Sequence, residues 1–302
     1  MTHYQLVAAN KRRSWLIIFS FITFITGAVY LMSYAFGYGL DTVGLALVFS
    51  GLGAFISYWW SDKIILGISG ARPATRQEFF DFYTTAENLA MSQRLSMPDL
   101  YVIDDSAINA FATGRDPEHA VICATTGLLS RLNRAEVEGV VAHELSHVSN
   151  YDIRLMSIVT VLVGLVSLIA DWMLRMTRFG GGKRKRDKDG AGQLELIFFV
   201  AGLLLAMLSP IIAQLIKLAL ARRREYLADS TAAAMTKNPE GLARALEKIA
   251  HDKEPLEAAN KATAHLYLAN PLKNKHDAVG MFAGLFSTHP PIEERIQRLR
   301  SL

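Results

Sequence analysis

The stretch VVAHELSHVSN, from Val140 to Asn150, combines two histidines and a glutamate in the arrangement H-E-x-x-H. His143 and His147 are four residues apart, so on a helix they share one face and can bind one metal ion from adjacent turns. Glu144 lies one step round the helix and can reach a water molecule on that metal. These residue types at this spacing predict zinc-dependent hydrolysis of a peptide bond, with Glu144 as the general base.

A catalytic zinc ion has three protein ligands and one open position, so a third ligand is required. The stretch RRREYLAD offers Glu225 and, one turn further on, Asp229. Alone, such a pair is typical of a charged, solvated helix start; together with the histidines it favours a metal site. We expect Glu225 to be the third ligand and Asp229 to accept the free N–H of a zinc-bound histidine, preferentially His143. The ligand set favours one Zn²⁺ per chain, although other divalent ions can occupy such a site in vitro.

A capped helix must position the two histidines. Asn133 is a predicted N-cap, and Glu136 completes a capping box, so we expect a helix from Arg134 to about Ser149. The flanking sequence predicts strands and further helices, and hence an α+β fold that is mainly helical. The expected strands are 99–105, 107–114 and 119–129, with a turn at 115–118, and the expected helices are 76–91, 222–235, 238–250 and 290–302.

Long apolar runs indicate membrane helices. Hydrophobic residues make up 51% of the 302 residues, and segments 15–36 and 42–60 carry no charge. Each segment is long enough to cross ~30 Å of hydrocarbon as a helix. The first is too long for the core of a secretory signal and has no small-residue cleavage site, so residues 1–63 are predicted to form a retained membrane hairpin. The only cysteine, Cys123, permits no intrachain disulfide and fits a reducing compartment.

Basic residues predict the orientation of this hairpin. Residues 11–13 are Lys-Arg-Arg, the turn 37–41 contains neither Lys nor Arg, and Lys63 and Arg72 follow the second span. The positive-inside tendency therefore places both ends, and the chain from about Ser61 onward, in the cytoplasm. The net charge of +4 reflects these basic clusters, which we expect to contact anionic lipid head groups. They lack interleaved aromatic residues, so no nucleic-acid partner is expected.

A second pair of apolar helical segments separates two parts of the expected protease domain. Residues 64–152 form the first part, 153–220 the apolar pair and 221–302 the second part. Within the pair, segments 156–170 and 196–216 flank a glycine-rich, basic loop at 175–193. If both segments cross the membrane, the basic loop lies outside, against the positive-inside tendency; if they form a hairpin that does not fully cross, the loop stays in the cytoplasm. The sequence leaves both arrangements open.

The combination of motifs resembles the HtpX family of membrane zinc metalloproteases and, more distantly, CAAX prenyl endoproteases. The likeness covers nearly the whole chain: the N-terminal hairpin, NAFATG, VVAHELSHVSNYD, the second apolar pair, RRREYLAD and STHPPIEERI. It implies a gluzincin-like endopeptidase with its active site on the cytoplasmic side of the bacterial inner membrane, multi-pass and linked to the stress response. Misfolded or damaged membrane proteins are the implied substrates. Carried over to this sequence, the resemblance makes His143, His147 and Glu225 zinc ligands and Glu144 the catalytic base, whereas the basic loop departs from the expected periplasmic turn.

The motif NAFATG contains Asn109, Ala110, Phe111 and Ala112. It would suit an edge strand that pairs with an extended substrate backbone. A buried hairpin strand explains the same residues nearly as well.

Four further polar residues lie near the motifs, and two of them have two interpretations each. His289 could hydrogen-bond a developing oxyanion or cap the last helix, and the cap is favoured. Arg295 could pair with a carboxylate near the site, but an exposed helix charge is favoured. Asn150 and Asp152 are explained by the end of the active-site helix.

A function of another class remains open from the sequence: a non-catalytic membrane protein whose zinc site serves to bind unfolded segments. Glu144 argues against it, because a structural zinc site has no use for a carboxylate beside its ligands and is usually closed by four of them. The sequence makes no prediction of the oligomeric state.

Overall fold

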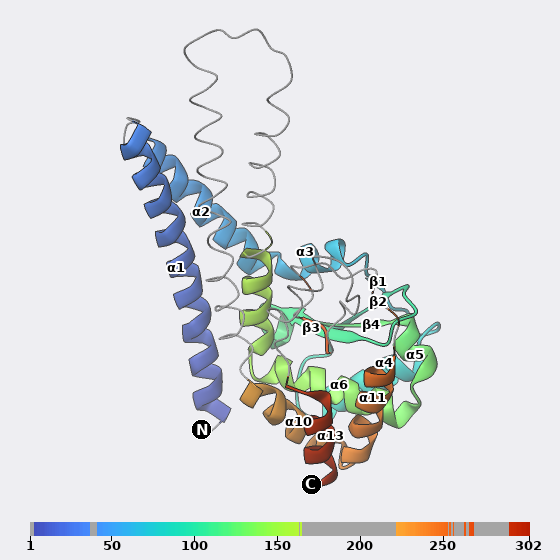
Figure 1. Cartoon of the computed structure of the whole chain (residues 1–302). Helices are drawn as coiled ribbons and strands as arrows, with labels where there is room; N and C mark the ends of the chain where they lie inside the picture. The colour runs from blue at the N-terminus through green and yellow to red at the C-terminus, as the bar shows by residue number, and fades with distance from the viewer. Residues whose placement is uncertain are drawn as a thin grey trace.

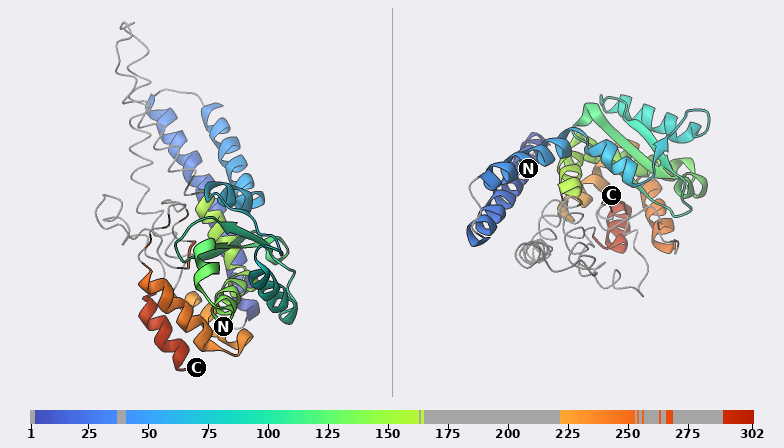
Figure 2. Two further views of the ribbon diagram at one scale, coloured as in Figure 1. Left: turned by 90° about the vertical axis from the view of Figure 1, so that its right-hand side faces the viewer. Right: turned by 90° about the horizontal axis from the view of Figure 1, so that it is seen from above.

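The computed structural model describes residues 3–36, 41–162, 164, 222–252, 254, 256, 263, 266–268 and 290–302. Two long helices, α1 (His3–Phe36) and α2 (Asp41–Trp59), lie against each other and project beyond the sheet and the remaining described helices (Figures 1 and 2). The short helix α3 (Ser61–Ile68) follows at their base. Judged by length and hydropathy, none of the helices in these ranges qualifies alone as a membrane span, but Val43–Trp59 and Ser61–Ile68, which meet at a 79° bend, qualify as a pair.

The described strands form one mixed sheet in the order β1-β2-β4-β3. Strands β2 and β4 are parallel, and the two outer pairs are antiparallel. The three predicted strands are present. A short 3₁₀ helix, Pro117–His119, overlaps the predicted polar turn 115–118, and its N-cap, Asp116, accepts hydrogen bonds from the N–H groups of Glu118 and His119. The strands are β1 (Arg72–Pro73), β2 (Asp99–Ile103), β3 (Ala110–Gly114) and β4 (Ala120–Thr125).

The prediction that the third strand continues to Leu129 is wrong. Strand β4 ends at Thr125, and helix α5 (Thr126–Arg131) begins there. The Thr125 hydroxyl accepts a hydrogen bond from Leu128 N–H and so caps the helix. The local hydroxyl cap therefore outweighs the apolar character of residues 127–129, which reads as strand in the sequence.

Alternate residues of the strands divide between two buried clusters, as the two-residue period of a strand requires. On one face, Ala112 and Ile122 pack with the helices α4 (Phe80–Ser92) and α6 (Arg134–Ser149). On the other face, Phe111 and Cys123 pack with α3 and with the helical residues 152–162. The sheet is thus covered by helices on both faces, and both faces are apolar.

Helix α4 begins later than the predicted Arg76. Residues 76–78 form a turn and residue 79 a bend, and Thr75 Oγ1 accepts a hydrogen bond from Glu78 N–H at 3.3 Å. The Glu78 carboxylate in turn receives two hydrogen bonds from Arg72 of β1, at 2.6 and 2.9 Å. These contacts link the segment to the edge of the sheet, and helix α4 starts at Phe80.

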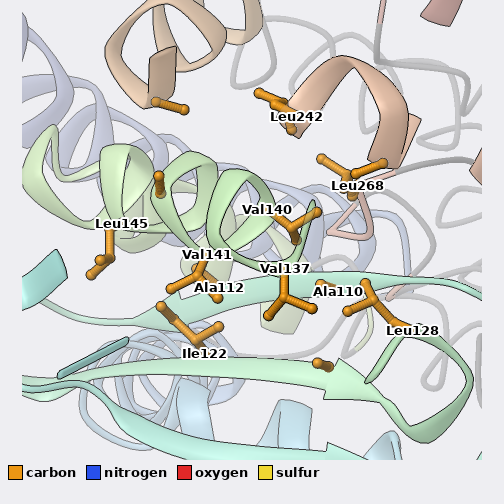
Figure 3. Packing of buried hydrophobic residues seen from close by; sticks show 14 of the residues in the cluster. Ala110, Ala112, Ile122, Leu128, Val137, Val140, Val141, Leu145, Leu242 and Leu268 are labelled. Atoms are coloured by element: carbon orange, nitrogen blue, oxygen red, sulfur yellow. The ribbon is translucent and has the colours of Figure 1, made fainter. Parts of the chain in front are cut away.

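Helix α6 is the central helix of the fold, and its predicted capping box is confirmed. Asn133 Oδ1 accepts from Glu136 N–H at 3.0 Å, and Glu136 Oε2 accepts from Asn133 N–H at 2.8 Å. Twelve of its 16 residues are buried, because the sheet lies on one side and other helices lie on the other. Figure 3 shows this packing through Val137, Val140 and Val141, the strand residues Ala110, Ala112 and Ile122, and Leu242 of the neighbouring helix.

The C-terminal part supplies three helices to the same layer: α10 (Arg222–Thr236), α11 (Pro239–His251) and α13 (Ile292–Arg300). Helices α10 and α11 both contact α6, and α13 contacts α11 and α10. The predicted fold class, α+β and mainly helical, is confirmed. Of the second apolar pair, residues 152–162 are helical; segment 196–216 and the basic loop 175–193 lie outside the described residues.

Candidate active site

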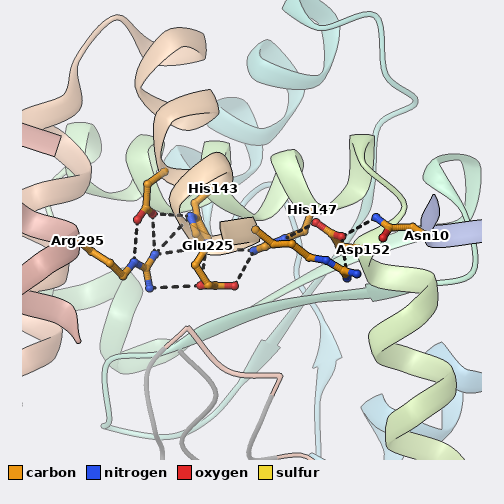
Figure 4. Close-up of polar contacts among 8 residues, drawn as sticks. Asn10, His143, His147, Asp152, Glu225 and Arg295 are labelled. Carbon is orange, nitrogen blue, oxygen red and sulfur yellow. Dashed lines mark hydrogen bonds and ion pairs between the residues drawn. The ribbon is translucent and has the colours of Figure 1, made fainter. Parts of the chain in front are cut away.

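Helices α6 and α10 bring three buried side chains to one point (Figure 4). His143 and His147 lie one turn apart on α6, and their Nε2 atoms face each other at 3.2 Å. Glu225 of α10 presents Oε2 at 3.8 Å from His143 Nε2 and Oε1 at 3.6 Å from His147 Nε2. Candidate ligand atoms of all three residues lie within 4.8 Å of one another. The arrangement thus offers two imidazoles and a carboxylate to one ion.

Each imidazole has a second carboxylate behind it. His143 Nδ1 lies 3.0 Å from Asp229 Oδ1, and His147 Nδ1 lies 3.2 Å from Asp152 Oδ2. If each Nδ1–H donates to its carboxylate, each Nε2 of a neutral ring is left as an acceptor. Two such acceptors and the Glu225 carboxylate around one point repel each other unless a cation lies among them. The donor set therefore fits a divalent metal ion.

The electrostatics of His147 agree with this preference for positive charge. Burial lowers the pKa of a histidine, but the hydrogen bond to Asp152 and the negative charges of Glu225, Asp152 and Glu144 outweigh it and raise the pKa of His147 to about 9. The carboxylates around the imidazole pair thus stabilise a positive charge there. A metal ion and a proton compete for this position.

The favoured interpretation of Arg295 as an exposed helix charge is wrong. Its side chain is 0% exposed, and it donates to both oxygens of Asp229, from Nε at 2.9 Å and from Nη2 at 2.7 Å. Its Nη1 lies 3.5 Å from Glu225 Oε2. Burial raises the pKa of Asp229, but the Arg295 charge and the hydrogen bonds from His143 and Arg295 lower it to about 2. Asp229 is therefore an anion between Arg295 and His143.

Asp152 does more than end the active-site helix. Besides its contact with His147, its Oδ1 accepts from Asn10 Nδ2 at 2.7 Å and from Arg224 Nη1 at 3.2 Å. Sequence reasoning assigned no role at the site to Asn10 or Arg224. The position of Arg224 beside Glu225 was a usable signal, whereas Asn10 lies 142 residues from Asp152 in the sequence and gives none.

Comparison with known proteins gives the chain its family. Residues 77–302 match Peptidase family M48. The chain belongs to peptidase family M48. A Protease HtpX homolog from Thermoanaerobacter pseudethanolicus is 43% identical, over 100% of this chain and 98% of its own length. A Protease HtpX homolog from Streptococcus uberis is 40% identical, over 99% of both chains. The predicted resemblance to the HtpX family is confirmed, and the chain is a peptidase.

A solved structure shares the fold of this M48 peptidase. The crystal structure of S. mikatae Ste24p matches with a TM-score of 0.50 and 18% sequence identity, and the match covers 98% of this chain and 67% of that one. At this identity the likeness concerns the fold alone.

In this M48 peptidase Glu144 is buried and lines a small cavity with both histidines. The cavity has a volume of about 10 Å³, which is close to the space that one water molecule requires. Glu144, the histidines and a water-sized space are thus adjacent, as hydrolysis requires. The remaining lining residues are Ala112, Met156, Leu266 and Leu268.

The strand from the NAFATG motif lies at the edge of the sheet beside the histidines. All five residues of β3 are buried, and Ala110 O accepts a hydrogen bond from Leu268 N–H at 2.9 Å on the side away from β4. Because alternate residues of a strand direct their backbone groups to the same side, Ala112 also faces that outer side. Asn109 holds the start of the strand, since its N–H donates to Thr125 Oγ1 and its Oδ1 accepts from Ala110 N–H. His289 lies outside the described residues.

Proposed function

We propose that this M48 peptidase is a zinc-dependent endopeptidase of the cytoplasmic membrane that cleaves misfolded or damaged membrane proteins. The convergence of His143, His147 and Glu225 from two helices, within 4.8 Å, is the observation that carries the proposal. Glu144 on the wall of the adjoining cavity supplies the base that such chemistry needs. The relatives named Protease HtpX homolog support the same activity.

The chain's own residues have distinct roles in the proposed reaction. His143, His147 and Glu225 would hold zinc, which would lower the pKa of a water molecule to about 7. Glu144 accepts a proton from the attacking water and hands it to the leaving amine. Asp229 and Asp152 fix the tautomer and orientation of the two imidazoles through Nδ1.

The edge strand β3 provides a place for the substrate backbone. An extended peptide that pairs with Ala112 would lie directly beside His143 and His147, since all three residues line the same cavity. Pairing through backbone hydrogen bonds makes few demands on side chains, which suits an enzyme for unfolded segments of varied sequence. The proposed substrate-binding strand also includes Asn109, Ala110 and Phe111, which support Ala112.

Exposed apolar side chains on α1 and α2 support the membrane location. Phe19 and Phe49 are each 68% exposed, which is unfavourable in water and favourable in hydrocarbon. Aromatic residues gather at the base of the pair, where Trp15 stacks on Tyr58 with ring centroids 5.9 Å apart, as in an interfacial belt. Other exposed apolar residues on the two helices are Trp15, Leu16, Phe24, Tyr30, Leu45, Leu47, Val48, Leu52, Phe55, Ile56 and Trp59.

The proposed orientation of the protein in the membrane follows from the N-terminal end of α1. Asn10 contacts Asp152 beside the metal site, and the basic residues 11–13 come directly after it. The positive-inside tendency assigns this end of the helix, and with it the active site, to the cytoplasm.

Activity and its dependence on Glu144 can be measured together. The full-length protein is purified in detergent with a chelator, zinc is added back, and casein cleavage is compared with that of Glu144→Gln. We expect cleavage only by the zinc-loaded wild type, because the amide that replaces the carboxylate cannot accept the proton. Equal cleavage by the variant would contradict the mechanism, and no cleavage by any sample would favour a non-catalytic protein that binds unfolded segments.

The side on which the basic loop lies can be tested with a single new cysteine. Cys123 is the only native cysteine and is fully buried, so Lys185→Cys can be probed without removing it. Labelling by an impermeant thiol reagent in intact cells would show that the second apolar pair crosses the membrane. Labelling only after lysis would place the loop in the cytoplasm.

A further inference from the structure

We propose that the base of helix α1 is part of the metal centre, with Asn10 as a positioning residue that holds Asp152 against His147. This inference rests on the proposed metal site. It extends that site to a helix that lies outside the residues, 77–302, matched to family M48.

One side-chain amide connects α1 to both ends of a short turn. Asn10 is buried, and its Nδ2 donates to Asp152 Oδ1 at 2.7 Å and to the Asn150 carbonyl at 2.8 Å. The other oxygen of Asp152 faces His147 Nδ1 at 3.2 Å. A continuous chain of polar contacts therefore runs from the α1 amide through a carboxylate to an imidazole of the metal site (Figure 4).

The turn that carries Asp152 is in contact with α1. Tyr151 has a φ of +60°, a left-handed conformation that residues other than glycine adopt only where the surroundings enforce it. The Lys11 ammonium lies 4.2 Å from the centre of the Tyr151 ring, and Asn10 holds the carbonyl just before it. Two neighbouring residues of α1 thus fix the turn that aims Asp152 at His147.

Asp152 needs this support because it is a buried carboxylate with a directional task. To keep His147 as a neutral ligand through Nε2, Asp152 must accept from Nδ1–H in the plane of the ring. Arg224 also donates to Asp152, to the same oxygen as Asn10, Oδ1. Loss of the Asn10 amide leaves the carboxylate free to turn toward Arg224 and away from the imidazole.

The test measures metal binding by the full-length protein in detergent. The variants are Asn10→Ala, the isosteric Asn10→Asp, which opposes the Asp152 carboxylate with a second one, and Asp152→Asn. Ser14→Ala is the matched control, because Ser14 is buried one turn further along α1 and its hydroxyl donates to the Asn10 carbonyl within the helix. Zinc affinity is measured by competition with a chelator, and the ligand field by the visible spectrum of the Co²⁺-loaded protein.

We expect Asn10→Ala to weaken zinc binding about tenfold and to shift the Co²⁺ bands, with larger effects for Asn10→Asp and Asp152→Asn. Ser14→Ala should match the wild type in both measurements. Wild-type affinity and spectrum in Asn10→Ala would overturn the inference; if that variant does not fold, wild-type values in Asn10→Asp would overturn it. Absence of zinc binding by the wild type would instead refute the proposed function.

Discussion

Arg295 binds Asp229 through two hydrogen bonds, with Nε 2.9 Å from Oδ2 and Nη2 2.7 Å from Oδ1. Arg295 lies three residues after the start of helix α13. Both side chains are buried, and Asp229 also faces His143 Nδ1 at 3.0 Å. The C-terminal helix α13 therefore supports one histidine of the site through Asp229, as the N-terminal helix α1 supports the other through Asp152. The two ends of the chain meet the site from opposite sides.

Replacing Arg295 should destabilise the protein strongly. Arg295→Met removes the guanidinium that binds both oxygens of the buried Asp229 carboxylate, and we expect a loss of about 3–5 kcal/mol in the free energy of unfolding. Denaturant titration of the full-length protein measures this. Arg300→Met is the matched control on the same helix, since Arg300 also pairs with two carboxylates, those of Glu240 and Glu247, but at the exposed surface. An equal loss in both variants would show that burial of the Arg295 pair is unimportant.

Metal removal should lower the stability of the protein as well as its activity. A ligand that binds only the folded state stabilises it by about 2.7 kcal/mol when its free concentration is a hundred times the dissociation constant. We therefore expect Tm to fall on chelation and to return when zinc is added. In Glu225→Ala, zinc should leave Tm unchanged. A full zinc response in that variant would place the metal elsewhere.

Glycine at position 139 allows α6 and α11 to touch. A Cβ at Gly139 would lie 2.6 Å from the backbone N of Leu242, closer than real contacts permit. Gly139→Ala must therefore push α11 away from the helix that carries both histidines, and we expect a loss of about 1–3 kcal/mol in the free energy of unfolding. Gly67→Ala serves as the control, because a Cβ there meets nothing within 4 Å. Tm values of both variants check the prediction, and an unchanged Tm in Gly139→Ala would contradict it.

The sequence predicts the parts of the site that lie close together along the chain. The H-E-x-x-H spacing identifies His143 and His147, and the capping box identifies where their helix begins. These signals are local, because helical periodicity and capping depend on residues three or four apart. The pairing of those histidines with Glu225, far beyond His147 in the sequence, followed from chemistry, since a zinc site lacks a third ligand without it.

The sequence could not predict the residues that support the ligands. Arg295 stands between Glu294 and Arg298 on a short charged helix, and such a pattern is typical of an exposed surface. Among the described residues, its burial results from the packing of α13 against α10 and α11. Asn10 likewise precedes an apolar run, and nothing local indicates that its amide meets a carboxylate 142 residues away. Tertiary contacts of this kind leave no periodic signal.

The thiol of Cys123 should report whether the protein is folded. It is fully buried on β4, between β2 and β3, and burial raises the pKa of the thiol well above its ordinary value. Since only the thiolate attacks thiol reagents, Cys123 should stay unlabelled by a maleimide at about pH 8 and react with one equivalent in denaturant. Met91→Cys, at a position that is 71% exposed, should react at once under native conditions. Equally fast native labelling of Cys123 in the wild type would mean that this face of the sheet opens readily, and it would rule out the buried cluster around the strand.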